Sequence, residues 1–301
     1  MINKTIFQGM GSWSRLFFFL FFLLLGIIIA LFIVSLITIP FASEVGTGGL
    51  SQNIPFLKIT QVVQSIGLFI VPVILYTYFF EENYQSFLKT KFNSSYSELL
   101  IIVILTIAIQ PIIQLVAYYN NLMNLPESMG AIEKWMRASE DSVKKIIELF
   151  IADKSIGSYA SNILIIAVLA GISEELFFRA GLQQIINRIV RNKNIAVWIT
   201  AIIFSAIHFQ FYGFIPRLLL GALLGYLFIW SKNIWIPILV HILHNAINII
   251  IPQIYFGSPK YEMMETMGIE NHMWLAAISL IISVILITTY KKKTENKTLS
   301  I

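Results

Sequence analysis

The clearest apolar run in the chain extends from Leu16 to Ile39 and contains no charged residue. It exceeds the roughly 20 residues that a helix needs to cross a hydrocarbon core. It is also far longer than the apolar core of a signal peptide, which has about 7–15 residues. We therefore interpret it as a first membrane span that is retained. With 57% hydrophobic and only 12% charged residues, the chain falls outside the soluble globular class, in which about a quarter of residues are charged.

Apolar segments of similar length recur along the chain. The candidate spans are 16–39, 56–80, 98–122, 158–179, 194–210, 214–231, 234–252 and 272–290. The sequence thus predicts an all-α fold, a polytopic membrane helix bundle of about eight transmembrane helices. We expect a single membrane domain covering residues 1–301.

Basic residues gather at the termini and in the loops on one side of this arrangement. They are Lys4, Arg15, Lys89, Lys91, Arg188, Arg191, Lys193, Lys232, Lys291, Lys292 and Lys293. By the positive-inside rule, both termini are cytoplasmic and the protein is a multi-pass protein of the cell (inner) membrane. This orientation accounts for the net charge of +5, and since no nucleic-acid motif interrupts the chain, we expect no nucleic-acid partner.

The chain contains no cysteine. Disulfides, thiolate metal ligands and a cysteine nucleophile are therefore excluded together.

The segment 126–153 has a different character. Apolar residues recur in it at helical spacing with charged residues between them, which predicts an amphipathic helix along the membrane surface. It serves either as a solvated connector or as a lid over a site in the bundle.

Charged residues interrupt the fourth span. Glu174, Glu175 and Arg179 stand inside otherwise apolar sequence, although one charge at the centre of a membrane helix costs about 2.5–3.5 kcal/mol on insertion scales. Glu175 and Arg179 are four residues apart and share one helix face, so they form an ion pair that either packs helices or supports a site. Glu174 points about 100° away and has no local partner, which suits a general base.

Polar residues also mark the fifth and seventh spans. Phe204 precedes His208 by one helical turn, so its ring is positioned to support the imidazole. His241 and Asn245 lie on one face of the seventh span. Either these residues carry chemistry, or His208 is interfacial and the others form hydrogen bonds between helices. For His244 and Asn248 we favour the hydrogen-bonding role.

Together these groups match the needs of amide hydrolysis, which are a base that activates water and donors to the developing oxyanion. Glu174 would take the proton from water, His208 would orient the water, and His241 and Asn245 would donate to the oxyanion. Two Glu and two His are also an acceptable zinc set, although the HExxH signature is absent. We expect no cofactor, with zinc as the alternative. Both aspartates lie outside the spans, and no serine elbow motif is present.

The three motifs, Glu174-Glu175-xxx-Arg179, Phe204-xxx-His208 and His241-xxx-Asn245, resemble the CPBP family of intramembrane endopeptidases in order and helix placement. This family includes CAAX prenyl proteases and bacteriocin-processing enzymes and is also called the Abi family. The resemblance covers a protease-like core of about 155–250, preceded by the amphipathic connector of about 126–153.

The resemblance implies an eight-helix bundle with a cavity in the membrane and glutamate-dependent catalysis without a metal. It implies that Glu174 and His208 activate water, that His241 and Asn245 form the oxyanion site, and that Glu175 and Arg179 support them. One departure is Ala180, where many members have glycine; here Gly181 follows one place later.

The main hypothesis is thus an intramembrane glutamic-type endopeptidase acting on membrane-associated proteins or peptides. The alternative is a non-catalytic bacteriocin-immunity or scaffold protein that binds peptides in the same cavity. A transporter with a proton relay is a third reading, but neither paired repeats nor broken helices support it. The expected partners are a peptide or membrane-protein substrate and the lipid bilayer, and nothing in the sequence specifies an oligomeric state.

Overall fold

The computed structural model describes residue 7 and residues 9–42, 49–261 and 266–299. Lys4, counted above among the basic residues that flank the first span, lies outside the described residues. The described residues form helices and contain no β-strand, so the all-α prediction is confirmed.

The longer helices follow one another with short connections. They are α2 (Ser12–Ala42), α3 (Ile54–Ser65), α4 (Val71–Phe80), α6 (Tyr96–Ala108), α7 (Gln110–Asn121), α8 (Gly130–Ala152), α12 (Lys193–Ala206), α13 (Phe214–Ser231), α14 (Trp235–Tyr255) and α16 (Met273–Leu299). The short helix α5 (Tyr84–Leu88) follows α4, and the π-helical stretch η2 (Ile66–Ile70) joins α3 to α4.

One long helix carries the charged motif. Its α-helical parts are α9 (Ile156–Asn162), α10 (Ala170–Glu175) and α11 (Gln184–Val190). Two π-helical stretches, η4 (Ile163–Leu169) and η5 (Leu176–Gln183), join these parts without a break. The fourth span was expected to end at Arg179, and this boundary is wrong, because the helix runs on to Val190.

Six helical segments in the described residues are long and apolar enough to cross a membrane. They are Ser12–Phe41, Ile54–Phe80, Tyr96–Asn121, Phe214–Ser231, Trp235–Tyr255 and Met273–Lys297. The shorter apolar helix α12 and the continuous helix 156–190 occupy the two other predicted spans. The chain is a multi-pass helical membrane bundle, and the count of eight spans stays a prediction.

Large apolar side chains face outward on the spans. On α2, for example, Phe17, Leu31 and Phe32 are exposed, as is Ile281 on α16. Exposed apolar surface of this extent is typical of a lipid-facing surface, because lipid tails are as apolar as the side chains.

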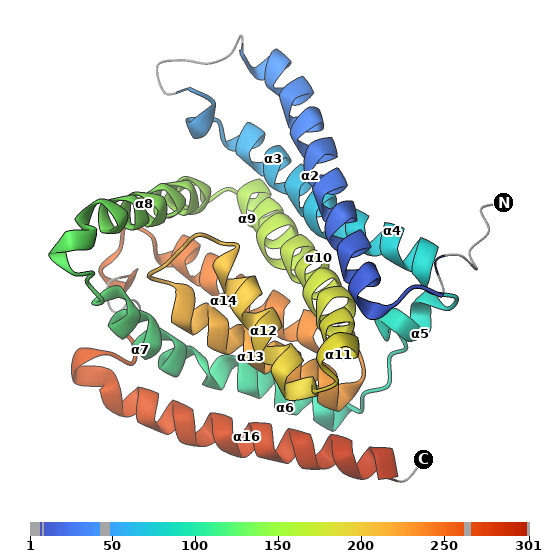
Figure 1. The fold of residues 1–301 in the computed structure, drawn as a ribbon. Coiled ribbons are helices and arrows are strands. Elements are labelled where there is room, and N and C mark those ends of the chain that lie inside the picture. Colours follow the sequence, from blue (N-terminus) through green and yellow to red (C-terminus); the bar gives the residue numbers. More distant parts are fainter. Residues whose placement is uncertain (1–6, 8, 43–48, 262–265, 300–301) are drawn as a thin grey trace.

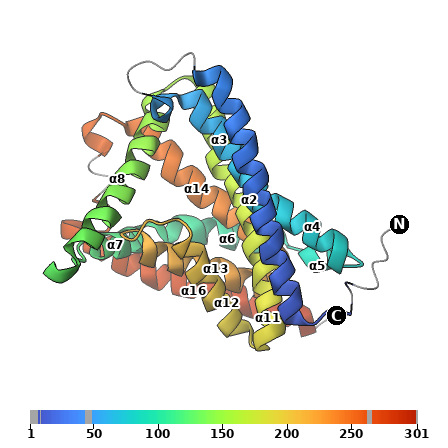
Figure 2. The same cartoon turned by 45° about the horizontal axis from the view of Figure 1, so that its top comes forward.

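Figures 1 and 2 show the helix α9–α11 crossing the middle of the bundle, with α2 and α4 against one side. The helices α12, α13 and α14 lie on its other side, and α6, α7 and α16 pack together along the edge of the bundle beyond them. The helix α2 begins and α16 ends at the same end of the bundle (Figure 1). α8 lies at the other end, in the segment where an amphipathic helix was expected.

Candidate active site

Close helix packing brings the motif of α10 against α14. A Cβ atom on Gly171 would lie 2.8 Å from Cγ1 of Ile242 and 3.2 Å from its backbone nitrogen. Only a residue without a side chain allows this approach. Ile242 follows His241 directly, so the contact at Gly171 places the His241 imidazole beside the carboxylates of Glu174 and Glu175.

The expected ion pair between Glu175 and Arg179 is present and fully buried. Glu175 Oε2 lies 3.1 Å from Arg179 Nε, with 0% and 1% of the two side chains exposed. The Arg179 guanidinium also donates to the backbone carbonyl of Gly221 on α13 at 3.2 Å and lies 4.8 Å from the ring centroid of Phe204. A buried charge requires such compensation, so this arginine joins α10, α12 and α13 around the motif.

His241 lies between the two adjacent carboxylates. Its Nδ1 is 2.8 Å from Glu175 Oε1, and its Nε2 is 3.8 Å from Glu174 Oε2. An ionised carboxylate can only accept, so Nδ1 carries a proton and donates to Glu175. Glu175 thereby sets the orientation of the ring and directs Nε2 toward Glu174.

Glu174 is the more accessible of the two carboxylates. Its side chain is 13% exposed, whereas that of Glu175 is completely buried. One oxygen of Glu175 pairs with Arg179, and the other accepts from His241. Glu174 has only the longer approach of His241 Nε2, which leaves it able to accept a proton from another molecule.

His208 lies in a turn rather than on the fifth span. The helix α12 ends at Ala206, a few residues before the end expected for the fifth span. Nδ1 of His208 donates to the carbonyl of Phe204 at 2.7 Å, which leaves Nε2 as the acceptor of the neutral ring. The Phe204 ring makes edge contacts with the imidazoles of both His208 and His241, at centroid distances of 5.2 and 5.9 Å.

Asn245 lies one turn after His241 on α14, and its amide donates to the carbonyl of Ile166 at 3.1 Å. Ile166 belongs to the π-helical stretch η4, and such stretches often occur at functional sites because they change the backbone hydrogen bonding. One N–H of the Asn245 amide is therefore committed to holding α14 against η4. The same group has a second N–H for another acceptor.

The remaining polar residues of α14 join helices, as expected. Gln110, at the start of α7, lies 3.2 Å from His244 Nδ1 and 3.4 Å from the Asn248 amide nitrogen. These contacts support the hydrogen-bonding role of His244 and Asn248.

Arg217 was not singled out in the sequence. It lies in the first turn of α13 and donates to Gln210 Oε1 at 2.6 Å. Its charge acts on both Glu174 and His208, so it contributes a positive field to the same site. The signal that could have found it is an arginine close to the start of an apolar span, where positive charge is costly.

The amphipathic helix α8 packs on the loop that carries His208. Ser139 donates to the carbonyl of Phe209 at 2.9 Å, and the rings of Trp135 and Phe211 lie 5.2 Å apart. Arg137 lies over the ring of Tyr212 at 3.5 Å. α8 therefore supports this loop and is more than a free connector.

Within the described part of the chain, no three His, Asp or Glu side chains converge in an arrangement that could hold a metal ion.

Residues 156–247 match the family model described as "Type II CAAX prenyl endopeptidase Rce1-like". Residues 156–247 are thus similar to the Rce1-like family, over about a third of the chain. The matched segment contains Glu174, Glu175, Arg179, Phe204, His208, His241 and Asn245. The resemblance stated from the three motifs is thus confirmed for this segment.

Part of the chain is also similar to a curated protein of no assigned function. The chain is 28% identical over 90 residues to the uncharacterized protein YpbD of Bacillus subtilis (strain 168). The similarity covers 29% of this chain and 43% of that protein, so it spans less than half of the relative's length. No solved structure matches the chain.

Proposed function

We propose that this protein is a glutamate-dependent intramembrane endopeptidase whose catalytic residues are Glu174, His208, His241 and Asn245. The substrates are membrane-associated proteins or peptides. The catalytic core corresponds to residues of about 155–250, and the helix within 126–153 supports it from outside. The observation that carries the proposal is the placement of His241 between two carboxylates, of which only Glu174 is left to accept a proton.

Hydrolysis begins when Glu174 takes a proton from water and the oxygen of that water bonds to the peptide carbonyl carbon. His208 Nε2 accepts a hydrogen bond from the same water and orients it. The oxyanion receives hydrogen bonds from Asn245 and from His241 Nε2 when this nitrogen carries a proton. The C–N bond then breaks, and Glu174 returns the proton to the leaving amine.

Glu175, Arg179 and Phe204 act as positioning residues in this scheme. Glu175 fixes the His241 ring, Arg179 balances the buried charge of Glu175, and the Phe204 carbonyl fixes the orientation of His208. The scheme uses no cofactor. Zinc held by the same carboxylates and imidazoles is the competing chemistry.

The proposed orientation of the protein in the membrane follows from the distribution of its basic residues. Arg15 lies in the first turn of α2 and shares Glu81 with Arg188, and Lys89 and Lys232 line a cavity together with Arg188. These basic residues thus gather at the end of the bundle where α2 begins, and both termini are cytoplasmic in our proposal. The host membrane is the cell membrane.

The test is cleavage of a membrane-protein and peptide library by the full chain in liposomes. Wild type is compared with Glu174→Gln and with the control Glu148→Gln on the outer helix α8, each with and without a chelator. We expect cleavage by wild type and the control in both conditions and none by Glu174→Gln. Loss of wild-type cleavage in chelator with recovery in zinc would replace the base mechanism by metal catalysis. Equal behaviour of wild type and Glu174→Gln would leave a peptide-binding protein.

A further inference from the structure

A small cavity of about 150 Å³ lies where α5, α11, α12 and α13 meet. Three lysines from three different elements line it. Lys89 follows α5, Lys193 begins α12 and Lys232 follows α13. Arg188 of α11 lines the same cavity. Four cations from distant parts of the sequence thus converge on one space.

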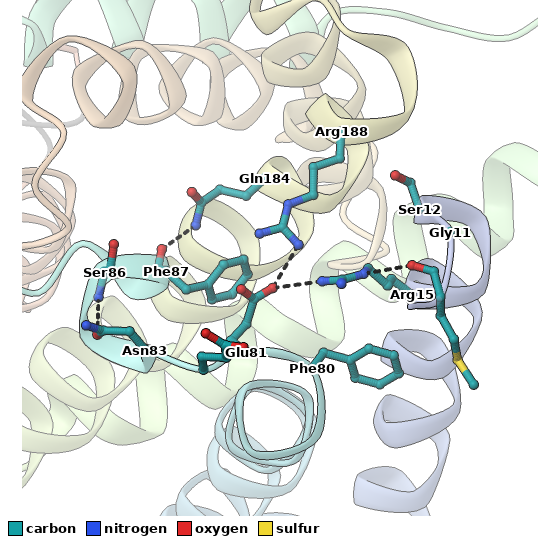
Figure 3. A pocket seen from close by; sticks show the side chains of 12 residues that line it. Gly11, Ser12, Arg15, Phe80, Glu81, Asn83, Ser86, Phe87, Gln184 and Arg188 are labelled. Carbon is teal, nitrogen blue, oxygen red and sulfur yellow. Dashed lines mark hydrogen bonds and ion pairs between the residues drawn. The ribbon is translucent and has the colours of Figure 1, made fainter. Parts of the chain in front are cut away.

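In the neighbouring cavity, a carboxylate of the chain neutralises the cations. That cavity, drawn in Figure 3, shares Arg188 with the lysine-lined cavity. In it, Arg15 and Arg188 both contact Glu81 Oε1, at 3.3 and 2.8 Å (Figure 3). One carboxylate of the chain serves two arginines, so the charge of Arg188 is already compensated.

The three lysines have no such carboxylate. No acidic side chain lines their cavity, and none of the ion pairs among the described residues includes Lys89, Lys193 or Lys232. Lys89 is half-buried, with its Nζ 4.8 Å from the ring centroid of Phe228. Burial lowers the pKa of Lys89, and the charges of Lys193 and Lys232 lower it further. The lysines repel one another, and no ion pair with a carboxylate of the described chain neutralises them.

Backbone geometry adds to this cost. Lys89 and Lys232 adopt left-handed backbone conformations with φ of 54° and 50°, a region that favours glycine. The carbonyls at the end of α13 offset part of the charge of Lys232, whereas Lys193 stands at the positive end of α12. Positive charges that gather without a carboxylate of the chain favour a site that an anion completes.

An exposed tryptophan lies beside the cavity. Trp235, at the start of α14, is 41% exposed, and its indole donates to the carbonyl of Thr90 at 2.8 Å. Thr90 follows Lys89 directly. Tryptophan is enriched at the level of lipid headgroups, so we expect the lysines to have access both to headgroups and to water.

We propose that Lys89, Lys193 and Lys232 form a binding site for a phosphate group, carried either by an anionic phospholipid or by a soluble phosphate. The volume of about 150 Å³ holds several water molecules and is sufficient for a phosphate group, which has one phosphorus and four oxygen atoms. Three ammonium groups supply the charge and the donors that its oxygens require. This site is separate from the protease site and does not depend on its chemistry.

The test measures amine acetylation of each lysine by mass spectrometry, on the full chain in phosphatidylcholine nanodiscs. One arm adds increasing phosphatidylglycerol, and the other adds inorganic phosphate. We expect Lys89 acetylation to slow at least tenfold and to saturate in one of the two arms. Lys291 and Lys292 lie at the same end of the bundle and are exposed, so we expect them to slow only by the few-fold that a surface potential causes.

Two variants of equal charge sharpen the result. Lys193→Gln with Lys232→Gln removes two cations from the cavity and should abolish the protection of Lys89. Lys291→Gln with Lys292→Gln removes the same charge from α16 and should leave the protection of Lys89 intact. Saturation by phosphatidylglycerol alone assigns the site to a lipid headgroup, and saturation by inorganic phosphate assigns it to a soluble phosphate. Absence of protection in both arms, or equal loss in both variants, would overturn the proposal.

Discussion

Replacement of Gly171 by alanine tests whether the approach of α14 to α10 sets the catalytic geometry. The new Cβ would lie 2.8 Å from Ile242 Cγ1, where ordinary contacts begin near 3.4 Å. α14 would therefore have to retreat by about 0.6 Å, and overpacking of this kind costs about 1–3 kcal/mol. His241 moves with Ile242, away from Glu174 and Glu175.

The expected catalytic effect follows from that displacement. A misplacement of 1 Å at a catalytic group costs about 100-fold in rate. We therefore expect Gly171→Ala to lower kcat about tenfold with a small effect on KM, measured as initial cleavage rates in liposomes. Thermal unfolding of the same preparation separates this effect from loss of folded protein.

Two further variants make the experiment decisive. Gly130→Ala at the start of α8 is the control, because nothing lies within 4 Å of its added Cβ. Gly171→Ala combined with Ile242→Ala removes the closest clash but leaves the backbone nitrogen of Ile242 at 3.2 Å, so we expect partial recovery of kcat. Wild-type rates in Gly171→Ala alone would refute the reasoning, since the position of His241 would then not depend on this contact.

Three further predictions concern the neighbouring residues. Glu175→Gln leaves Arg179 buried without its partner charge, and we expect a destabilisation of about 3–5 kcal/mol in denaturant unfolding; an unchanged unfolding midpoint would contradict this. Asn245→Ala removes an oxyanion donor, so kcat should fall about 100- to 1,000-fold with KM nearly constant; a rise in KM alone would instead assign Asn245 to substrate binding. Trp135→Ala releases the loop of His208 and should lower kcat, whereas Trp274→Ala, an exposed position on α16, should not; equal effects would mean that α8 does not position the loop.

The helix order could be predicted from the sequence because a membrane span requires a long apolar run. The boundaries of two spans could not be predicted in this way. Arg179 looks like the end of an apolar run, but Glu175 and the Gly221 carbonyl compensate its charge, so the helix continues to Val190. Ile207 and Phe209 continue the apolar pattern past the point at which α12 ends, so the turn that carries His208 was not visible.

The site was predictable in its residue types and less so in its geometry. The motifs identified Glu174, Glu175 and His241, because polar groups are costly in apolar spans. The position of His241 between both carboxylates depends on the packing of Gly171 against α14, and no sequence pattern encodes this distance. Arg217 was missed for a related reason, since the fold brings its charge to the site from another helix.

The contact between α2 and the catalytic helix has a consequence for biogenesis. A Cβ on Gly181 would lie 2.8 Å from the Phe19 ring, so the absence of a side chain at Gly181 allows this ring to pack against the helix. The two residues are about 160 positions apart, which is roughly 10–30 s of synthesis. During this interval α3 and α4 can already pack on the first helix, and Phe19 can contact Tyr76, whereas the part of its face that meets Gly181 still lacks its partner helix.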